Sequence, residues 1–378
     1  MITSLQLPTS SFSRLLPQGD GRLQSDTCTN EGGRVKCLTF NAAPTNIVFI
    51  KVHKAGSTTV SNILARYALH YDLNIALPKD KPPYREGFHC FGPFRADRVV
   101  PLGQGQTYHV LFNHMRYNRT ELDKVMPKDA FYCAIMREPV SRFVSAMYYF
   151  GVLKPPSTKN VSQVSPGFSK FLSETGRKGL EVRPLPELLY NSIAFDTGLA
   201  LTQQKSIEAV EQHIAKLDRE LDLMMVMEYF HESLVLLKRR ARLQLRDIIH
   251  VKLNSKRPRS THLISDSDLK TLKDWQMADH KIYDHFLAKF WKEVRKEGPD
   301  FQDEVKHFQE IQTKVARFCR ASKDSFDVLF VPWCRWGDAF TVTPWDCDLL
   351  TMDERKLQRL LLDRTAHRKG KLNTSRTE

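Results

Sequence analysis

Residues 46–59 read NIVFIKVHKAGSTT. The β-branched and aromatic run at the start predicts a buried strand, and Val60, Ile63 and Leu64 then recur at helical spacing. Between them, Lys-Ala-Gly-Ser-Thr-Thr predicts a tight turn that leads into the first turn of a helix. In such a turn, backbone N–H groups and the positive end of the helix dipole converge on an anion. This segment therefore predicts a site for a phosphate-like group.

The predicted turn supplies three kinds of donor. Gly56 lets the backbone approach an anion closely, Lys54 adds a full positive charge, and the residues after Gly56 add hydroxyl groups. The residues expected to line the site are Lys54, Ala55, Gly56, Ser57, Thr58 and Thr59. A nucleotide-hydrolysing P-loop would read G-x-x-x-x-G-K-[ST], whereas here the Lys precedes the only Gly. Read alone, the segment also fits an ordinary Ser/Thr-capped helix after a strand.

A second segment, AFYCAIMREPVSRFVSAMYYF at residues 130–150, has the same form. Its apolar start predicts another buried strand, and Pro139 suits the first turn of the next helix, where its missing N–H is not needed. Arg137 stands at the end of the strand, and Ser145 follows about two helical turns later. Arg offers a bidentate fork for phosphate and Ser a neutral donor. Read alone, Arg-Glu-Pro is a common helix start, and Arg142 is then a solvated surface charge.

Taken together, the two segments predict a ligand with two phosphate-like groups. The carboxyl ends of parallel strands lie at one edge of a sheet, where open α/β sheets bind ligands. Two anion-binding turns at that edge match one ligand with a phosphate-like group at each end.

A third segment, YHVLFNHMRY at residues 108–117, predicts a short strand that ends in Asn-His. A lone His at a strand end is often a hydrogen-bonded structural residue. Beside two phosphate loops, His114 is instead a candidate general base, because imidazole titrates near neutral pH.

These three segments resemble those of the galactose-3-O-sulfotransferase family, which includes the galactosylceramide (cerebroside) sulfotransferases. Further similar segments are Met227–Leu237, Lys252–Asn254 and Trp275–Asp279, and the resemblance runs from about Asn46 to Cys347. It implies an α/β fold of the P-loop-like sulfotransferase type, with a central parallel sheet flanked by helices and a helical C-terminal part. It also implies 3′-phosphoadenosine 5′-phosphosulfate (PAPS) as donor and a galactose-terminated glycolipid or glycan as acceptor.

The resemblance implies direct in-line transfer of the sulfuryl group to a sugar hydroxyl, O3 of a terminal β-galactose. His114 would remove the hydroxyl proton, and Lys54 would neutralise the charge that grows on the leaving phosphate. His53 either assists as a second donor or orients Lys54. PAPS would be bound by Lys54, Ala55, Gly56, Ser57, Thr58, Thr59, Arg137 and Ser145. No metal is expected, because cationic side chains and loop N–H groups carry the charge.

Other functions fit parts of the pattern. Ala55 and Gly56 resemble the loop of uronyl 2-O-sulfotransferases, which leaves a uronic acid or another glycosaminoglycan acceptor as the alternative. His53 before Lys54 favours the galactose family over that alternative. A non-catalytic glycan-binding relative is a third interpretation, disfavoured because the expected catalytic and donor-binding side chains are all present. A kinase or GTPase would need a Walker Lys-Ser/Thr and a Mg-binding Asp, and the sequence has neither in register.

Composition agrees with an enzyme that binds anions. The chain has 378 residues, 41% of them hydrophobic, which suffices for one large α/β domain. Its net charge of +14 favours an anionic partner. No RNA-binding signature, finger spacing or basic-aromatic repeat indicates nucleic acid. We expect a flexible stem-like segment at 1–43, the PAPS-dependent domain at 44–298, and a C-terminal helical extension with a basic disordered tail at 299–378.

The N-terminal ~40 residues contain no apolar run approaching the ~20 residues that span a bilayer. No signal peptide is visible either. Members of the resembling family are type II Golgi membrane proteins. The resemblance therefore implies the Golgi lumen or membrane, with an N-terminal anchor that is missing from this sequence. Sequons at Asn118, Asn160 and Asn373 fit a lumenal location.

The seven cysteines show no Cys-x-x-Cys metal pattern. Cys133 lies in a predicted core strand and is expected to be a buried thiol. Cys319 and Cys347 match positions typical of the resembling family, which implies a disulfide joining the C-terminal helices. The odd number leaves at least one thiol unpaired unless an intermolecular bridge forms.

The rest of the chain shows mixed patterns. Residues 151–167 carry several Pro, Ser and Gly and predict an exposed loop, which suits the rim of an acceptor site. Helical periodicity occurs at 206–220, 230–245, 266–297 and 300–321, and strand-like runs occur at 221–229 and 248–253.

Overall fold

The computed structural model describes residues 26–31, 34–39, 45–79, 88, 92–152, 169, 171, 173, 186–251, 264–321 and 327–374. The chain divides into two compact units, Met1–Ala43 and Pro44–Glu378. In the first unit, β1 (Asp26–Glu31) and β2 (Arg34–Thr39) form an antiparallel hairpin. All predicted site residues lie in the second unit.

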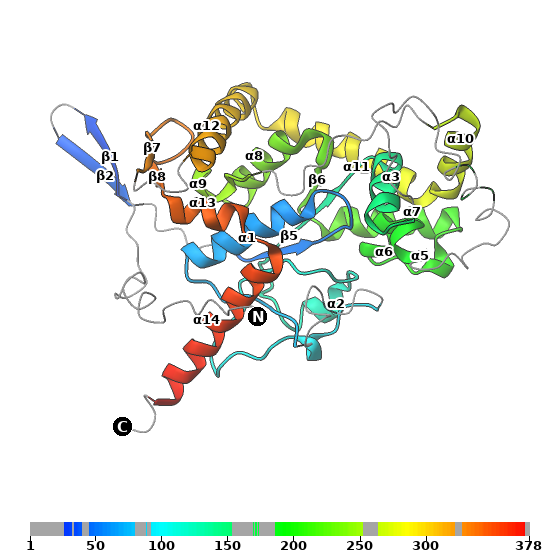
Figure 1. The fold of residues 1–378 in the computed structure, drawn as a ribbon, viewed down its shortest axis with the longest axis horizontal. Coiled ribbons are helices and arrows are strands. Elements are labelled where there is room, and N and C mark those ends of the chain that lie inside the picture. The colour runs from blue at the N-terminus through cyan, green and yellow to red at the C-terminus, as the bar shows by residue number, and fades with distance from the viewer. Residues whose placement is uncertain are drawn as a thin grey trace, which may run out of the picture. The chain divides into compact units, whose positions relative to one another are not determined.

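The second unit is built on a parallel sheet of four strands in the order β4-β3-β5-β6 (Figure 1). The strands are β3 (Ile47–Ile50), β4 (Val110–Leu111), β5 (Phe131–Met136) and β6 (Leu223–Val226). Every side chain in them is buried except that of Phe131, which is half-buried, as expected for a parallel sheet covered on both faces. Because all pairs are parallel, the segments after the four strands meet at one edge of the sheet.

Helices pack on this sheet and on one another, which confirms the predicted α/β class (Figure 1). The helix α1 contacts α9, α13 and α14; α8 contacts β6 and α12; and α11 contacts α3, α6, α7 and β6. The described α-helices are α1 (Ser57–His70), α2 (Arg119–Leu122), α3 (Pro139–Tyr149), α5 (Pro186–Leu189), α6 (Ser192–Asp196), α7 (Ile207–Glu220), α8 (Phe230–Arg240), α9 (Leu245–Ile248), α10 (Asp266–Trp275), α11 (Met277–Lys296), α12 (Phe301–Ala321), α13 (Pro344–Thr351) and α14 (Glu354–Thr374). Short 3₁₀ turns are η2 (Ala96–Arg98), η3 (Leu201–Gln203) and η4 (Met227–Tyr229).

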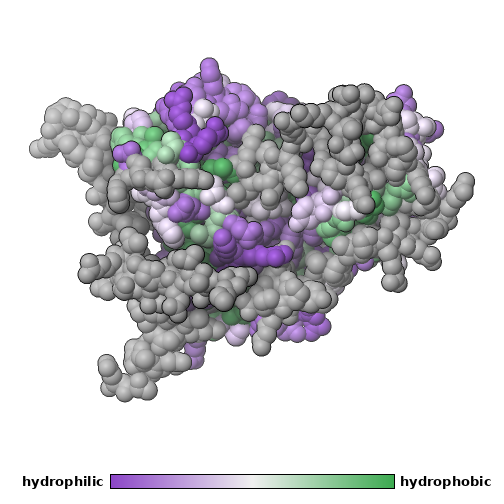
Figure 2. All heavy atoms as spheres, in the orientation of Figure 1, coloured by the Kyte–Doolittle hydropathy of each residue, from purple (hydrophilic) through white to green (hydrophobic). Residues whose placement is uncertain are grey.

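Local sequence explains how two of these helices form. The hydroxyl of Ser206 accepts a hydrogen bond from the Ala209 N–H at 3.2 Å, which caps the helix predicted at 206–220 and found as α7. The helix predicted at 300–321 is found as α12, with Phe308 and Ile311 among its buried residues. Hydrophilic side chains gather over its outer face (Figure 2). Amphipathic periodicity was therefore a reliable guide for these two helices.

The single helix predicted at 266–297 is wrong, because it is divided at Gln276 into α10 and α11. The buried amide of Gln276 donates to the Leu189 carbonyl at 2.6 Å and accepts from the Asn191 N–H at 3.1 Å. The break thus lets a polar side chain satisfy buried backbone groups outside its own helix.

Three other predicted boundaries also need correction. The strand predicted at 248–253 is wrong for the described residues, because Ile248 ends the helix α9 and the backbone N–H and carbonyl of His250 bond the Gln312 side chain instead of another strand. The helix predicted at 230–245 ends at Arg240, and Arg242 just beyond it has a left-handed φ of 55°. The strand predicted at 221–229 is limited to β6, followed by η4. Residues 153–167 of the predicted exposed loop lie outside the described residues.

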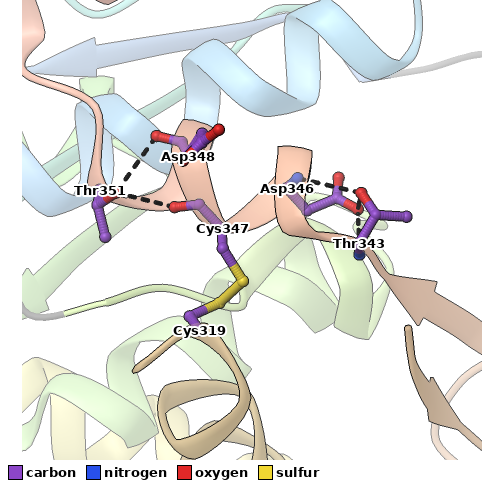
Figure 3. The surroundings of a disulfide bond; sticks show 6 residues. All are labelled: Cys319, Thr343, Asp346, Cys347, Asp348 and Thr351. Carbon is purple, nitrogen blue, oxygen red and sulfur yellow. Dashed lines mark hydrogen bonds between the residues drawn. A yellow bond between two sulfur atoms is a disulfide. The ribbon is translucent and has the colours of Figure 1, made fainter. Parts of the chain in front are cut away.

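The C-terminal part is fastened by a disulfide between Cys319 of α12 and Cys347 of α13, which confirms the implied pairing (Figure 3). Two short strands, β7 (Leu329–Val331) and β8 (Phe340–Val342), lie between these helices in sequence and pair antiparallel. Cys133 is a buried free thiol in β5, as predicted. None of the helices among the described residues is both long enough and apolar enough to cross a bilayer.

Candidate active site

The turn between β3 and α1 has a backbone that favours an anion. Lys54 and Gly56 are both left-handed, with φ of 62° and 76°. Gly56 is the N-cap of α1; among the described residues no side chain caps this helix, and its first turn contains no acidic residue. No residue of its own first turn therefore offers a carboxylate to its N-terminal N–H groups and helix dipole. A left-handed non-glycine residue costs on the order of 1 kcal/mol, and such strain is concentrated at functional sites.

Gly56 is also required by a close approach. A Cβ atom at this position would lie 2.3 Å from Sδ of Met227, the first residue after β6. The Ser57 hydroxyl donates to the Val52 carbonyl at 2.7 Å, so its proton holds the turn together. Ala55, Ser57 and Thr59 are buried, whereas Thr58 is half-buried. Thr58 is therefore the most exposed of the three hydroxyl-bearing residues predicted at this site.

The turn between β5 and α3 lies against the first turn. Nη1 of Arg137 donates to the Lys54 carbonyl at 3.4 Å, so the two predicted anion sites are adjacent. Ser145 is half-buried on α3, and Tyr149 follows one helical turn later on the same face. Nζ of Lys54 lies 3.6 Å from the centroid of the Tyr149 ring. The sequence interpretation missed Tyr149, although its spacing from Ser145 was a usable signal.

The N-terminus of α3 differs from that of α1. The carboxylate of Glu138 accepts hydrogen bonds from the N–H groups of Val140 at 2.9 Å and Ser141 at 2.7 Å. The Glu138 N–H in turn donates to the Glu228 carboxylate, after β6, at 3.1 Å. Because these first-turn N–H groups already have an acceptor, the Arg137 side chain is the candidate anion-binding group at this turn.

Two imidazoles lie beside the Lys54 turn. The rings of His53 and His114 are stacked, with centroids 3.9 Å apart and planes 13° from parallel. Nδ1 of His53 lies 2.9 Å from both carboxylate oxygens of Asp196, and the His53 backbone N–H donates to the same group at 2.7 Å. Nδ1 of His114 lies 3.1 Å from the Lys51 carbonyl oxygen. The structure thus joins both predicted histidines into one pair.

The electrostatic setting of His114 keeps it neutral. Burial is the largest factor that holds its pKa well below the ordinary value for His, followed by the positive charges possible at His53, Lys51 and Lys54. A neutral His114 retains one unprotonated ring nitrogen, so it can accept a proton, but its conjugate acid is disfavoured.

Below the turn lies a buried cation that sequence analysis missed. The Lys51 side chain is 0% exposed and pairs with Glu354, the first residue of α14. The same Lys51 supplies the carbonyl that contacts His114. A buried ammonium needs such a partner, because an isolated buried charge is strongly disfavoured. The N-terminus of α14 therefore supports the strand end that carries the candidate site.

The interpretation of Arg142 as a solvated surface charge is wrong. Its side chain is 0% exposed and lies 3.6 Å, Nε to Oδ2, from the carboxylate of Asp279. It donates to the carbonyls of Leu188 at 3.0 Å and Leu189 at 2.9 Å. The Trp275–Asp279 segment thus acts structurally, by supporting α5 and α6 next to α3. Burial raises the pKa of the Asp279 carboxyl to about 6.

The two turns bring two candidate anion-binding groups together. Lys54 and the N-terminus of α1 form one, and Arg137 forms a second one in contact with it. No cluster of three His, Cys, Asp or Glu side chains among the described residues could hold a metal ion. The donor set is cationic and rich in N–H groups, as phosphate and phosphosulfate ligands require.

Comparison with known proteins agrees with this chemistry. Residues 4–327 match the family model described as galactose-3-O-sulfotransferase. The chain belongs to the galactose-3-O-sulfotransferase family. It is 32% identical over 278 residues to galactose-3-O-sulfotransferase 2 of Homo sapiens, covering 73% of this chain and 68% of that protein.

Two further relatives in this family have different names. The chain is 32% identical over 259 residues to galactosylceramide sulfotransferase of Homo sapiens, covering 67% of this chain and 58% of that protein. It is also 32% identical over 281 residues to galactose-3-O-sulfotransferase 3 of Mus musculus, covering 72% of this chain and 63% of that protein. Because the identities are equal, they do not single out one acceptor within the family.

Proposed function

We propose that this protein is a PAPS-dependent galactose 3-O-sulfotransferase. The observation that carries the proposal is the contact between two anion-binding turns at the carboxyl ends of neighbouring parallel strands, in a member of this family. The contact between Arg137 and the Lys54 carbonyl brings a guanidinium to the turn that holds Lys54. One ligand with anionic groups at both ends can therefore engage both turns.

The donor-binding roles follow from this arrangement. PAPS supplies the sulfuryl group, and the Lys54–Thr59 turn would hold its 5′-phosphosulfate end. Arg137 and Ser145 would hold the 3′-phosphate, through a charged fork and a neutral hydroxyl. Lys54 would neutralise the charge that develops on the bridging oxygen of the leaving phosphate.

The acceptor hydroxyl needs a group that takes its proton as the new S–O bond forms. His114, the base predicted from the sequence, and His53, stacked on it, are the two imidazoles at the site. The proposed acceptor is the 3-OH of a terminal β-galactose on a glycolipid, galactosylceramide-like, or on a glycoprotein glycan. The proposed location is the lumen of the Golgi apparatus, with 1–43 as a stem before the catalytic domain at 44–298 and its helical extension at 299–378.

A labelled-sulfate transfer assay tests the reaction. Uncharged β-galactosides and galactosylceramide are compared with desulfated heparan and dermatan chains at matched ionic strength, and the linkage of each labelled product is determined. We expect label at O3 of galactose. Only incorporated sulfate counts, because a protein of net charge +14 binds long polyanions nonspecifically at low salt. Label in a uronic acid but not in galactose would contradict galactose as the acceptor, but it would not contradict PAPS as the donor.

A binding experiment tests the donor separately. Calorimetry should show that adenosine 3′,5′-bisphosphate binds far more tightly than ATP, because Arg137 and Ser145 address a 3′-phosphate that ATP lacks. Equal affinity for the two nucleotides would contradict PAPS as the donor.

A further inference from the structure

We infer that Asp196 is a positioning residue that makes His53, rather than His114, the proton acceptor of the transfer reaction. The inference rests on the proposed sulfotransferase function and assigns a task to a carboxylate 143 residues away from His53 in the sequence.

The contacts of Asp196 fix both the orientation and the tautomer of His53. The Asp196 side chain is 1% exposed and accepts hydrogen bonds from the backbone and ring of His53 at 2.7–2.9 Å. An ionised carboxylate only accepts, so Nδ1 of His53 must carry the hydrogen. Nε2 of His53 is then the unprotonated nitrogen, which can accept a proton.

His114 has a similar tautomer but a different electrostatic partner. A carbonyl oxygen also accepts only, so the contact with Lys51 places a hydrogen on Nδ1 of His114 as well. That partner is neutral, however, and the nearby ionisable groups are His53, Lys51 and Lys54. A proton on His114 would meet these cationic groups, whereas a proton on His53 would face the Asp196 carboxylate. Because the rings are stacked, protonation of one also disfavours protonation of the other.

The fold holds Asp196 in place independently of His53. Asp196 ends α6, whose first-turn N–H groups at Ile193 and Ala194 donate to the buried Asp279 carboxylate at 3.1 and 2.9 Å. The Asp196 carbonyl accepts from the Tyr117 N–H at 2.9 Å, three residues after His114. The charged groups that act on Asp196 from neighbouring elements are Arg142 of α3 and Asp279 of α11. A carboxylate fixed in this way is preorganised to orient an imidazole.

Lys54, His53 and Asp196 account for the charge and the proton that the sulfuryl transfer releases. The acceptor hydroxyl oxygen attacks sulfur, the new O–S bond forms, and the bond from sulfur to the bridging phosphate oxygen breaks. The bonding electrons leave on the phosphate, where Lys54 stabilises them. The hydroxyl proton passes to Nε2 of His53, and the resulting imidazolium is stabilised by Asp196, which remains ionised, until the proton is lost to solvent.

The test is Asp196→Asn in the full chain. We expect kcat to fall by roughly 10²–10⁴-fold, as when a carboxylate that orients a catalytic imidazole is neutralised. The KM for PAPS should change little. The acidic limb of the kcat/KM profile should move to lower pH, because the imidazolium has lost its counter-charge. His53→Ala should reduce kcat more than His114→Ala does.

Asp279→Asn is the matched control. It also neutralises a buried carboxylate that accepts hydrogen bonds from α6, but this carboxylate contacts backbone N–H groups and Arg142, and not His53. It should lower the melting temperature without moving the acidic limb. The inference is overturned if both variants leave the limb in place, or if His114→Ala reduces kcat more than His53→Ala.

Two measurements separate this inference from the proposed function. If the wild-type protein transfers no sulfate to any galactoside, the proposed function fails. The state of His53 is then read directly from ¹⁵N chemical shifts of its ring, assigned with the His53→Ala variant. The expected signal of the neutral wild-type ring is protonated Nδ1 and unprotonated Nε2, altered in Asp196→Asn. Protonation at Nε2 in the wild type would overturn the role of Asp196 even if the variant does not fold.

Discussion

The N-termini of α1 and α3 follow neighbouring strands of one sheet, yet they present different groups to a ligand. At α1, Gly56 is the N-cap, and among the described residues no side chain caps the helix. At α3, the Glu138 carboxylate caps the helix by accepting from two first-turn N–H groups. The first-turn N–H groups of α1 can therefore bind an anionic ligand, whereas those of α3 already bond the carboxylate of Glu138.

This difference assigns separate kinds of binding to the two turns. We infer that the α1 turn binds its anion through backbone N–H groups, the helix dipole and Lys54. The α3 turn would instead bind its anion through the side chains of Arg137 and Ser145. Two segments with the same strand-turn-helix pattern therefore need not bind phosphate in the same way. The following substitutions separate the two modes.

The largest effect is expected at the α1 turn. Lys54→Ala should lower turnover by at least about 100-fold and also weaken adenosine 3′,5′-bisphosphate binding, since the charge acts on both the bound donor and the leaving group. Steady-state kinetics and calorimetry measure the two effects. Lys54→Arg keeps the charge and should lose less of both. Near-normal turnover of Lys54→Ala would remove Lys54 from the mechanism.

At the α3 turn, Arg137→Ala should weaken adenosine 3′,5′-bisphosphate binding by about 1.5–3 kcal/mol, the scale of a charged hydrogen bond. Binding of adenosine 5′-monophosphate, which lacks the 3′-phosphate, should change much less. Calorimetry with both ligands makes the comparison, and Arg240→Ala, which removes an arginine paired with Glu293, is the control. An equal loss for both ligands would place Arg137 at the 5′ end instead.

Gly56→Ala tests the backbone of the α1 turn. We expect the free energy of unfolding to fall by about 1–2 kcal/mol from the left-handed φ alone. The contact with Met227 adds a further loss, which Met227→Ala in the same chain should relieve. Gly92→Ala is the control, because a Cβ there meets no atom of the described structure within 4 Å. Denaturant unfolding that gave equal stabilities for Gly56→Ala and Gly92→Ala would contradict the strained turn.

The smallest effect is expected from Glu138→Ala, which removes the α3 cap. Stability should fall by about 0.5–2 kcal/mol, as for other N-cap losses, while nucleotide affinity stays nearly unchanged. Thermal unfolding and calorimetry give the two values, and Glu138→Gln should recover part of the cap. An affinity gain of more than about tenfold would mean that the uncapped α3 N-terminus binds an anion, and the contrast with α1 would fail.

Much of the fold was readable from local patterns. The buried strands β3 and β5 were predicted from continuous apolar runs, and α7 and α12 from helical periodicity, because burial on a sheet or helix face repeats along the chain. The errors at Gln276 and at His250 have one cause. Each of these segments is shaped by a polar side chain that bonds backbone groups, and hydrophobic periodicity does not report such bonds.

The residues of the candidate site also fall into two groups, those that local sequence predicts and those that only the structure shows. Lys54, Gly56, Arg137 and His114 could be chosen from the sequence, because each follows a predicted strand and parallel strands end at one edge. The structure alone revealed Asp196 beside His53, Glu354 beside Lys51 and the burial of Arg142. These partners are 143 and 303 residues from the groups they contact, so no local pattern links them.

The chain therefore carries its proposed donor-binding residues in short segments, where residue type and spacing suffice to identify the family and to select the candidate turns. The choice between two imidazoles does not reside in such a segment. It depends on which ring meets a buried carboxylate, and burial strengthens that interaction while leaving no trace in the surrounding sequence. Only folding, which packs α6 against the end of β3, puts Asp196 next to His53 and gives the two histidines different partners.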